Sequence, residues 1–187
     1  MDMDSKECRY REELIRIFEK ANSDFLKNEK SLILDGVSER TLCGSLMWYL
    51  KKEISESTFR EYYVDVEYNR NNGKIKTIKN SKEEIITINC DLIIHSRGEI
   101  IEQDNLLALE MKKSTAPKEE KLKDKERLMA LTKDTFDDVW SFDGKTLPEH
   151  VCRYILGIYY EVDIEKRKIY MEYYKKGDLF HAYEISF

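Results

Sequence analysis

The sequence lacks long hydrophobic runs and the glycine- and proline-rich stretches that mark linkers. Its 187 residues include only seven Gly and two Pro, which leaves no room for a long flexible linker between domains. No segment approaches the roughly 20 apolar residues of a membrane-spanning helix. The acidic and polar start, residues 1–14, has no apolar run of the kind that a signal peptide carries. We therefore expect one domain over residues 1–187, located in the cytoplasm, with no membrane partner.

Cysteine is also scarce and scattered. No two of the four cysteines form a C-x-x-C pair, so their spacing favours neither a zinc site nor a disulfide framework. Each one lies on or beside an apolar pattern, where a thiol behaves as a small hydrophobe. We therefore expect four reduced residues in the core: Cys8, Cys43, Cys90 and Cys152.

Histidine occurs only three times, at His95, His150 and His181, and no nucleophile motif accompanies it. Hydrolysis by a Ser or Cys nucleophile is therefore disfavoured. The chain also lacks an excess of positive charge, because its net charge is -5 and its pI is near 5.4. This balance argues against nucleic-acid binding by bulk electrostatics, although a local basic patch can still serve such a contact.

Hydrophobic content of 41% is enough for a folded core, and its periodicity predicts both helices and strands. Ser38 is a typical N-cap, and a connector is expected over 31–37. Helices are predicted over 6–28, 38–52 and 117–132. Strands are predicted over 59–70, 74–78, 85–95, 106–113 and 151–162, followed by a terminal hairpin over 168–174 and 179–187. This order predicts an α/β domain with a mixed central sheet flanked by helices.

Two details of these helices carry further expectations. Gly44, inside the second helix, costs about 1 kcal/mol relative to Ala, which predicts that another backbone approaches closely there. The helix over 117–132 is nearly all charged in its first half, which is either a basic contact surface or a solvated face. Its residues expected to face inward are Leu122, Leu128, Met129 and Leu131.

The stretch from Ile85 to Lys113 places three charged residues inside otherwise apolar strands: Asp91, Glu110 and Lys112. Side chains alternate between the two faces of a strand, so Glu110 and Lys112 share a face. If the hairpin is centred near residues 100 and 101, the numbers of cross-strand partners sum to about 201. Asp91 then lies opposite Glu110, with Cβ atoms roughly 5 Å apart, and two carboxylates meet.

Like charges directly opposite in a sheet are unfavourable unless something positive lies between them. Mg²⁺ meets this need, because it prefers oxygen ligands, is held by one or two carboxylates and keeps waters for a phosphate. Lys112 is placed to hold or deprotonate such a water, or to neutralise charge on the phosphate. A third acid, Glu39, lies on the inward stripe of helix 38–52, where a carboxylate is costly unless paired or metal-bound. The alternative for Glu39 is a first-turn acid favoured by the helix dipole.

At these residues the sequence resembles the PD-(D/E)XK nuclease superfamily, which has the restriction-endonuclease-like fold. The resemblance rests on Asp91 followed by an apolar run, and on apolar residues that lead into Glu110-Met111-Lys112. Cys90 stands where such families often have a proline before the Asp. The resemblance implies a restriction-endonuclease-like αβββαβ core, to which this chain adds an N-terminal helix and a C-terminal hairpin.

The resemblance further implies a metal-dependent nuclease that hydrolyses phosphodiester bonds in nucleic acid, with DNA favoured over RNA and a homodimer as one option. Its catalytic residues would be Asp91, Glu110, Lys112 and Glu39. Its Mg²⁺ ion, which Mn²⁺ can replace, would be bound by Asp91, Glu110, Glu39 and the backbone carbonyl of Met111. Candidate nucleic-acid contacts are Arg40, Lys113, Lys121 and Lys125. The alternatives are an inactive module of the same fold that binds nucleic acid or a protein, and solvated charges on an ordinary hairpin.

Overall fold

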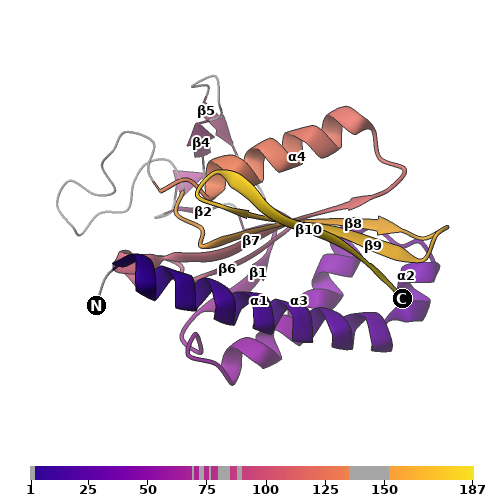
Figure 1. The fold of residues 1–187 in the computed structure, drawn as a ribbon, viewed down its shortest axis with the longest axis horizontal. Coiled ribbons are helices and arrows are strands. Elements are labelled where there is room, and N and C mark those ends of the chain that lie inside the picture. The colour runs from indigo at the N-terminus through magenta and orange to yellow at the C-terminus, as the bar shows by residue number, and fades with distance from the viewer. Residues whose placement is uncertain are drawn as a thin grey trace.

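A mixed six-stranded sheet forms the centre of the computed structural model (Figure 1), which describes residues 3–68, 70–71, 74–75, 77–79, 85–87, 90–134 and 152–187. The helices are α1 (Met3–Asn28), α2 (Lys30–Leu34), α3 (Glu39–Ser55) and α4 (Lys118–Leu131), with a 3₁₀ turn over Ile101–Gln103. The strands of the sheet are β1 (Tyr63–Val66), β6 (Leu92–His95), β7 (Asn105–Lys113), β8 (Leu156–Asp163), β9 (Lys168–Lys175) and β10 (Asp178–Ser186). The predicted α/β class is confirmed.

The order of strands in the sheet is β1-β6-β7-β8-β9-β10. All neighbours are antiparallel except β7 and β8, which are parallel because α4 carries the chain back between them. Four short strands form two separate antiparallel pairs between β1 and β6 in the chain. They are β2 (Arg70–Asn71) with β3 (Lys74–Ile75), and β4 (Thr77–Lys79) with β5 (Ile85–Thr87).

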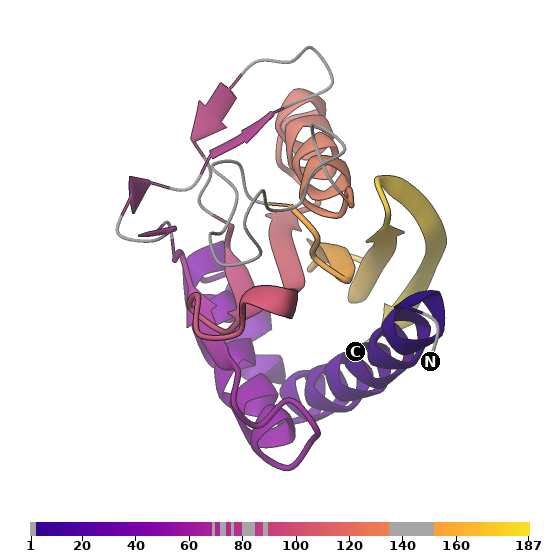
Figure 2. The ribbon, with the colours of Figure 1, turned by 90° about the vertical axis from the view of Figure 1, so that its left-hand side faces the viewer.

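Helices cover both faces of the sheet: α1 and α3 lie against one face and α4 against the other (Figure 2). From Leu107 onward the two faces of β7 alternate as predicted, with Leu107, Leu109 and Met111 in the cluster under α1 and α3. Leu106, expected on the opposite face, belongs to the same cluster and lies beside a register shift. Ala108 belongs to the second cluster, which includes Leu128 of α4. Because β7 is buried on both faces, its charged residues Glu110 and Lys112 are held inside the layer beneath α4.

Several helix predictions are confirmed and others are wrong. The side chain of Ser38 caps α3 by accepting a hydrogen bond from the backbone N–H of Thr41 at 3.2 Å. The connector predicted over 31–37 instead contains α2, which buries Ile33. The close approach predicted at Gly44 is wrong, because a Cβ built there would have no contact within 4 Å.

The inward face of α4 was also predicted only in part. Leu128 and Leu131 are buried, but Leu122 is 54% exposed and Met129 is 37% exposed. The side of α4 that faces the sheet carries Lys121, Asp124 and Lys125 before these two leucines, and each of the three pairs with a charged side chain of the sheet. Leu122 and Met129 lie beside this stripe and therefore point to solvent.

The first strand is shorter than the predicted range of 59–70. Phe59 is buried in a turn, where the N–H of Tyr62 donates to its carbonyl at 2.9 Å, so the strand begins only at Tyr63. Glu67 ends it, because its φ of 51° lies in the left-handed region that extended backbone does not adopt. Residue 69 and residues 135–151 lie outside the described residues.

The cysteines agree with the prediction of reduced residues, since none is in a disulfide and Cys43, Cys90 and Cys152 are buried. Cys8 is an exception to the predicted core position, because it is only half-buried.

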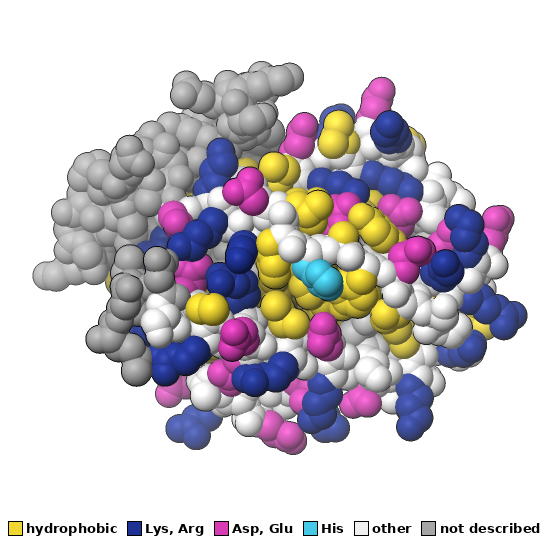
Figure 3. Space-filling model, in the orientation of Figure 1, with side chains coloured by type: hydrophobic (Ala, Val, Ile, Leu, Met, Phe, Trp, Pro, Cys, Tyr) yellow, Lys and Arg dark blue, Asp and Glu magenta, His cyan; other side chains and the backbone are white. Residues whose placement is uncertain are grey.

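On the face of the molecule shown in Figure 3, Lys and Arg side chains are interspersed with Asp and Glu, and hydrophobic side chains gather where β10 passes α1. No helix among the described residues is long and apolar enough to span a membrane.

Candidate metal and nucleic-acid site

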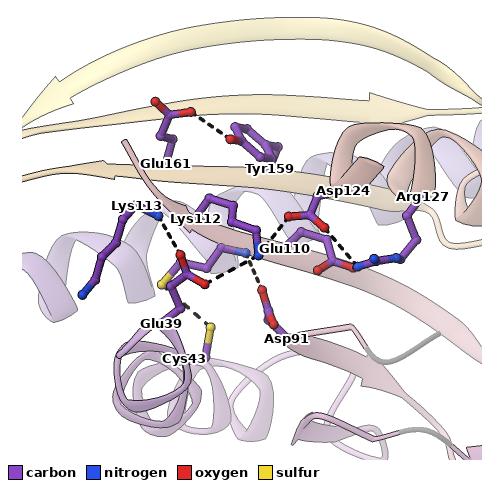
Figure 4. Close-up of polar contacts among 11 residues, drawn as sticks. Glu39, Cys43, Asp91, Glu110, Lys112, Lys113, Asp124, Arg127, Tyr159 and Glu161 are labelled. Carbon is purple, nitrogen blue, oxygen red and sulfur yellow. Dashed lines mark hydrogen bonds and ion pairs between the residues drawn. The ribbon is translucent and has the colours of Figure 1, made fainter. Parts of the chain in front are cut away.

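The register between β6 and β7 matches the sequence prediction. Leu92 pairs with Leu109 and Ile93 with Ala108, so the numbers of each pair sum to the predicted value. Asp91 lies one residue before β6, and the next pair in this register would join it to Glu110. The two predicted carboxylates therefore come from neighbouring segments of the sheet, Asp91 from just before β6 and Glu110 from β7, as Figure 4 shows.

Among the described residues, the part of β7 beyond Leu109 has no strand partner on the side of β6, because β6 begins only at Leu92. Two carboxylates take the place of that missing strand. Oδ2 of Asp91 accepts a hydrogen bond from the backbone N–H of Met111 at 2.8 Å, and Oε1 of Glu39 accepts one from the N–H of Lys113 at 2.8 Å. The N–H and C=O of one strand residue point to the same neighbour, so the Met111 carbonyl faces Asp91.

Glu110 is the most deeply buried acid of the site, with a side chain only 1% exposed. Its Oε1 accepts a hydrogen bond from Nη1 of Arg127, on α4, at 2.7 Å. Burial raises the pKa of Glu110 to about 8, Arg127 opposes this rise, and the negative charges of Asp91 and Asp124 add to it. The negative charge of Asp91 is thus one of the causes that keep the pKa of Glu110 raised.

Lys112 lies between two carboxylates that come from helices on opposite faces of the sheet. Its Nζ is 3.1 Å from Oδ2 of Asp124 in α4 and 3.5 Å from Oε2 of Glu39 in α3. Burial alone would lower the pKa of Lys112, but these two carboxylates raise it above its ordinary value. The ammonium group therefore stays protonated, which suits electrostatic stabilisation better than proton abstraction.

The site carries an excess of negative charge. When all are ionised, the four carboxylates of Glu39, Asp91, Glu110 and Asp124 outnumber the two cations beside them, Lys112 and Arg127, by two charges. Burial also raises the pKa of Asp91, despite the hydrogen bond from Met111. The same acids affect the buried thiol of Cys43. Its pKa is raised mainly by burial and further by the negative charges of Asp91, Glu110 and Glu39.

This donor set fits a hard divalent cation. Carboxylates and a backbone carbonyl supply oxygen ligands, and one divalent charge would balance the excess. Within the described ranges, no group of three or more His, Cys, Asp or Glu residues is arranged so that it could hold a metal ion. Mg²⁺ needs only one or two carboxylates and completes its shell with water, so Asp91, Glu110 and the Met111 carbonyl are the ligands that this region offers.

The four predicted nucleic-acid contacts are all engaged in contacts within the chain. Arg40 pairs with Glu67 at 2.9 Å and remains 74% exposed. Nζ of Lys113 donates to the carbonyl of Gly36 at 2.7 Å. Lys121 pairs with Glu161 at 2.9 Å, and Lys125 pairs with Glu172 at 2.7 Å, both beneath α4. Of the four, Arg40 is the one whose side chain is mostly open to solvent.

Sequence reasoning missed Asp124 and Arg127, which reach the site from α4. Asp124 is only 4% exposed, and its Oδ2 lies 3.1 Å from Nζ of Lys112. Its Oδ1 is 3.2 Å from Nη1 of Arg127. Asp124 lies four residues before the buried Leu128, so a helical stripe extended backward from Leu128 would have found it.

The same polar layer continues along the sheet under α4. Glu161 of β8 accepts a hydrogen bond from the hydroxyl of Tyr159 at 2.8 Å. Glu172 of β9 accepts hydrogen bonds from the hydroxyls of Tyr170, at 2.7 Å, and Tyr174. These contacts, with Lys121 and Lys125 above them, explain why the first half of α4 is charged although it faces the sheet.

A separate polar cluster lies at the other end of β6. Nε2 of the buried His95 is 3.0 Å from Oδ2 of Asp65, and Arg97 donates two hydrogen bonds to the same carboxylate at 2.8 and 2.6 Å. The guanidinium of Arg97 also lies 4.1 Å from the ring centre of Tyr63. His95 is thus paired with Asp65, at the end of β6 away from Asp91.

Comparisons of the chain with protein-family models, with curated proteins and with solved structures find no match.

Proposed function

We propose that this chain is a divalent-metal-dependent nuclease of the PD-(D/E)XK type, which hydrolyses phosphodiester bonds in nucleic acid, DNA in preference to RNA. The observation that carries the proposal is the meeting of Asp91 with the Glu110-Met111-Lys112 segment of the next strand. Two buried acids of like charge are unfavourable on their own, and a cation shared between them removes that cost.

The connectivity of the central elements also supports the proposal. The chain runs α3, β1, β6, β7, α4 and β8, and the four strands lie in the order β1-β6-β7-β8 with only the last pair parallel. This connectivity supports the αβββαβ core that the sequence resemblance implies. Here α1 and the hairpin of β9 and β10 are additions at the two ends of the chain.

In this proposal the ion is held by Asp91, Glu110 and the Met111 carbonyl, with Glu39 beside them. When bound, the ion would supply positive charge to a substrate phosphate and lower the pKa of a bound water. Lys112 would stabilise the negative charge that develops on the phosphate, because Asp124 and Glu39 keep its ammonium protonated and fixed. Arg127 holds Glu110 in place from above the sheet.

The test is cleavage of plasmid, single-stranded DNA and RNA with Mg²⁺, with Mn²⁺ and with EDTA. Wild type should cleave only with a divalent ion, and a Glu110→Ala/Lys112→Ala double variant should lose cleavage. Glu126→Gln, on the exposed side of α4, is the matched control and should cleave like wild type. Cleavage that persists in the double variant, or a wild type inactive on all three substrates, would reject the proposal.

A second candidate is an inactive module of the same fold that binds nucleic acid or a protein. The internal pairing of the site favours it, because Arg127 already neutralises Glu110 and Lys112 already lies between Glu39 and Asp124. Under this alternative, binding is independent of divalent ions. Glu110→Ala would then alter stability but not binding, so the same set of variants separates the two candidates.

A further inference from the structure

The charged residues of α3 are sorted between its two sides. Both of its carboxylates turn inward: Glu39 reaches β7, and Glu53, which is only 7% exposed, pairs with Lys20 of α1 at 2.7 Å. Its three cations, Arg40, Lys51 and Lys52, are exposed. We use the term outer face of α3 for the solvent side made by Arg40, Thr41, Gly44, Trp48, Lys51 and Lys52. This face is positively charged and bears no acid of its own.

A large aromatic side chain lies in the middle of the outer face. Trp48 is 69% exposed, which is the greatest exposure among the large hydrophobic side chains of the described residues. Nζ of Lys51 lies 5.7 Å from the centre of its ring, close enough for a cation–π interaction. Exposed tryptophan beside cations is the combination by which proteins stack the bases of single strands while contacting their phosphates.

Gly44 lies one helical turn before Trp48 on the same face, and nothing inside the protein explains it. A Cβ at this position would have no contact within 4 Å, so no neighbouring element requires a glycine there. Glycine is unfavourable in a helix interior, and a position that breaks this rule without an internal reason is often a functional one. A bare helix surface next to Trp48 allows a ligand to approach the backbone closely.

The outer face is continuous with the candidate metal site through α3 itself. Glu39, at the start of the helix, contacts Lys112 and Lys113, and Arg40 is the next residue on the outer face. Trp48 follows Arg40 roughly 12 Å farther along the helix axis, at 1.5 Å per residue. A strand lying on this face would therefore pass from Trp48 over Gly44 and Arg40 toward the acids at the end of β7.

From these observations we propose that the outer face of α3 binds single-stranded nucleic acid. A base stacks on Trp48, and phosphates contact Arg40, Lys51 and Lys52. Charge complementarity selects this partner, because Lys51 and Lys52, with Arg40 that also pairs with Glu67 and remains 74% exposed, suit a polyanion. A duplex keeps its bases stacked on each other, so they are not available to Trp48. The link between this face and cleavage rests on the proposed nuclease function, whereas binding itself does not.

The first test measures binding of fluorescein-labelled dT20 by fluorescence anisotropy in EDTA, where no cleavage occurs. Trp48→Ala should weaken binding about 5- to 100-fold, as expected for the loss of base stacking. Lys51→Gln/Lys52→Gln should weaken binding and reduce its dependence on salt. Lys27→Gln/Lys30→Gln, which removes two exposed lysines from α1 and α2, and Leu179→Ala, which removes an exposed apolar side chain from β10, are the matched controls.

The second test reads Trp48 directly. The chain has two tryptophans, so emission in a Trp140→Phe background comes from Trp48 alone. Addition of dT20 should quench that emission, and a dA20·dT20 duplex should compete poorly. Gly44→Gln should weaken binding of dT20 without loss of thermal stability, since its side chain covers the surface beside Trp48.

Several outcomes would overturn the inference. They are absence of dT20 binding by wild type, equal binding by Trp48→Ala and wild type, equal loss in the control variants, and equal affinity for duplex. A further one is a change in sedimentation of the pure protein on Trp48→Ala, which would make this face a contact between copies. If Trp48→Ala binds normally while Glu110→Ala/Lys112→Ala abolishes cleavage, the inference fails and the nuclease function stands. Trp48-dependent binding without any cleavage gives the reverse result.

Discussion

The side chain of Asp91 accepts a hydrogen bond from the backbone N–H of Met111 at 2.8 Å. This contact joins the loop before β6 to the middle residue of the Glu110-Met111-Lys112 segment. The same carboxylate raises the pKa of Glu110, so Asp91 both closes an open edge of β7 and adds to the negative charge of the site. Substitution of Asp91 by Asn can separate these two roles, because it removes the charge but keeps an oxygen that accepts the hydrogen bond from Met111.

We expect Asp91→Asn and Asp91→Ala to differ in stability but not in activity. The amide of Asn retains an oxygen that can accept from Met111, so Asp91→Asn should fold with nearly wild-type stability. Asp91→Ala leaves that N–H without its partner and should lower the free energy of unfolding by about 1–2 kcal/mol. Both variants should lose divalent-ion-dependent cleavage. Urea unfolding and cleavage assays check this, and an active Asp91→Asn would contradict it.

Glu110 predicts a pH dependence of stability in EDTA. Burial raises its pKa to about 8 from an ordinary value of 4.5, so between these values the folded chain holds a proton that the unfolded chain has released. The stability contributed by this group is therefore complete below about pH 4.5 and is lost as the pH rises toward 8.

Glu110→Gln mimics the protonated acid, so it should be more stable than wild type at pH 8.5, by roughly 1–3 kcal/mol, and nearly equal at pH 5. Mg²⁺ at pH 8.5 should stabilise wild type and leave Glu110→Gln unchanged. Thermal unfolding from pH 5 to 9 measures both effects, with Glu126→Gln as an exposed control. Parallel profiles for wild type and Glu110→Gln would show that Glu110 is not a perturbed acid.

The cluster around Asp65 should support the fold without taking part in ion binding. Burial alone would raise the pKa of Asp65, but hydrogen bonds from His95 and Arg97 hold it well below its ordinary value of 3.8. Its stabilising effect is therefore present above pH 3.8 and is lost as the pH falls farther. Asp65→Asn should cost about 1–3 kcal/mol at pH 7, less at pH 3, and bind Mn²⁺ like wild type. Lost Mn²⁺ binding in a folded variant would refute this division of roles.

Two glycines should respond to alanine in opposite directions. A Cβ at Gly157 of β8 would lie 3.0 Å from Cγ2 of Thr132 and 3.2 Å from Cβ of Tyr174, so Gly157→Ala should destabilise the protein by about 1–3 kcal/mol. Gly44 has open space around it, so Gly44→Ala should stabilise it by about 0.5–1 kcal/mol. Urea unfolding decides the matter. Effects of the same sign would show that local packing is not what distinguishes the two positions.

The sequence was sufficient to predict β7, β9, β10 and the register between β6 and β7. The single strand predicted over 85–95 is instead two strands, β5 and β6, which belong to different sheets. Alternation of apolar residues assigns Leu107 and Leu109 to one face and Ala108 and Glu110 to the other, and a buried face allows only one register. Ser38 as the N-cap of α3 was equally predictable, because a hydroxyl before an amphipathic stretch satisfies an open N–H of the first turn.

Other features depend on tertiary pairing that periodicity does not reveal. Asp124 faces inward only because Lys112 and Arg127 are there to meet it, whereas hydrophobicity alone favours Leu122, which is exposed. The end of β1 was also not predictable, because it depends on the left-handed conformation of Glu67, a residue type that does not indicate a turn.

The most direct test of the account is calorimetric titration of Mn²⁺ into the metal-free protein at pH 8. We predict that wild type binds at least one Mn²⁺ per chain and that Asp91→Asn/Glu110→Gln, shown to be folded by circular dichroism, binds none. Absence of binding by wild type, or equal binding by the double variant, would contradict the claim that these two acids share a cation.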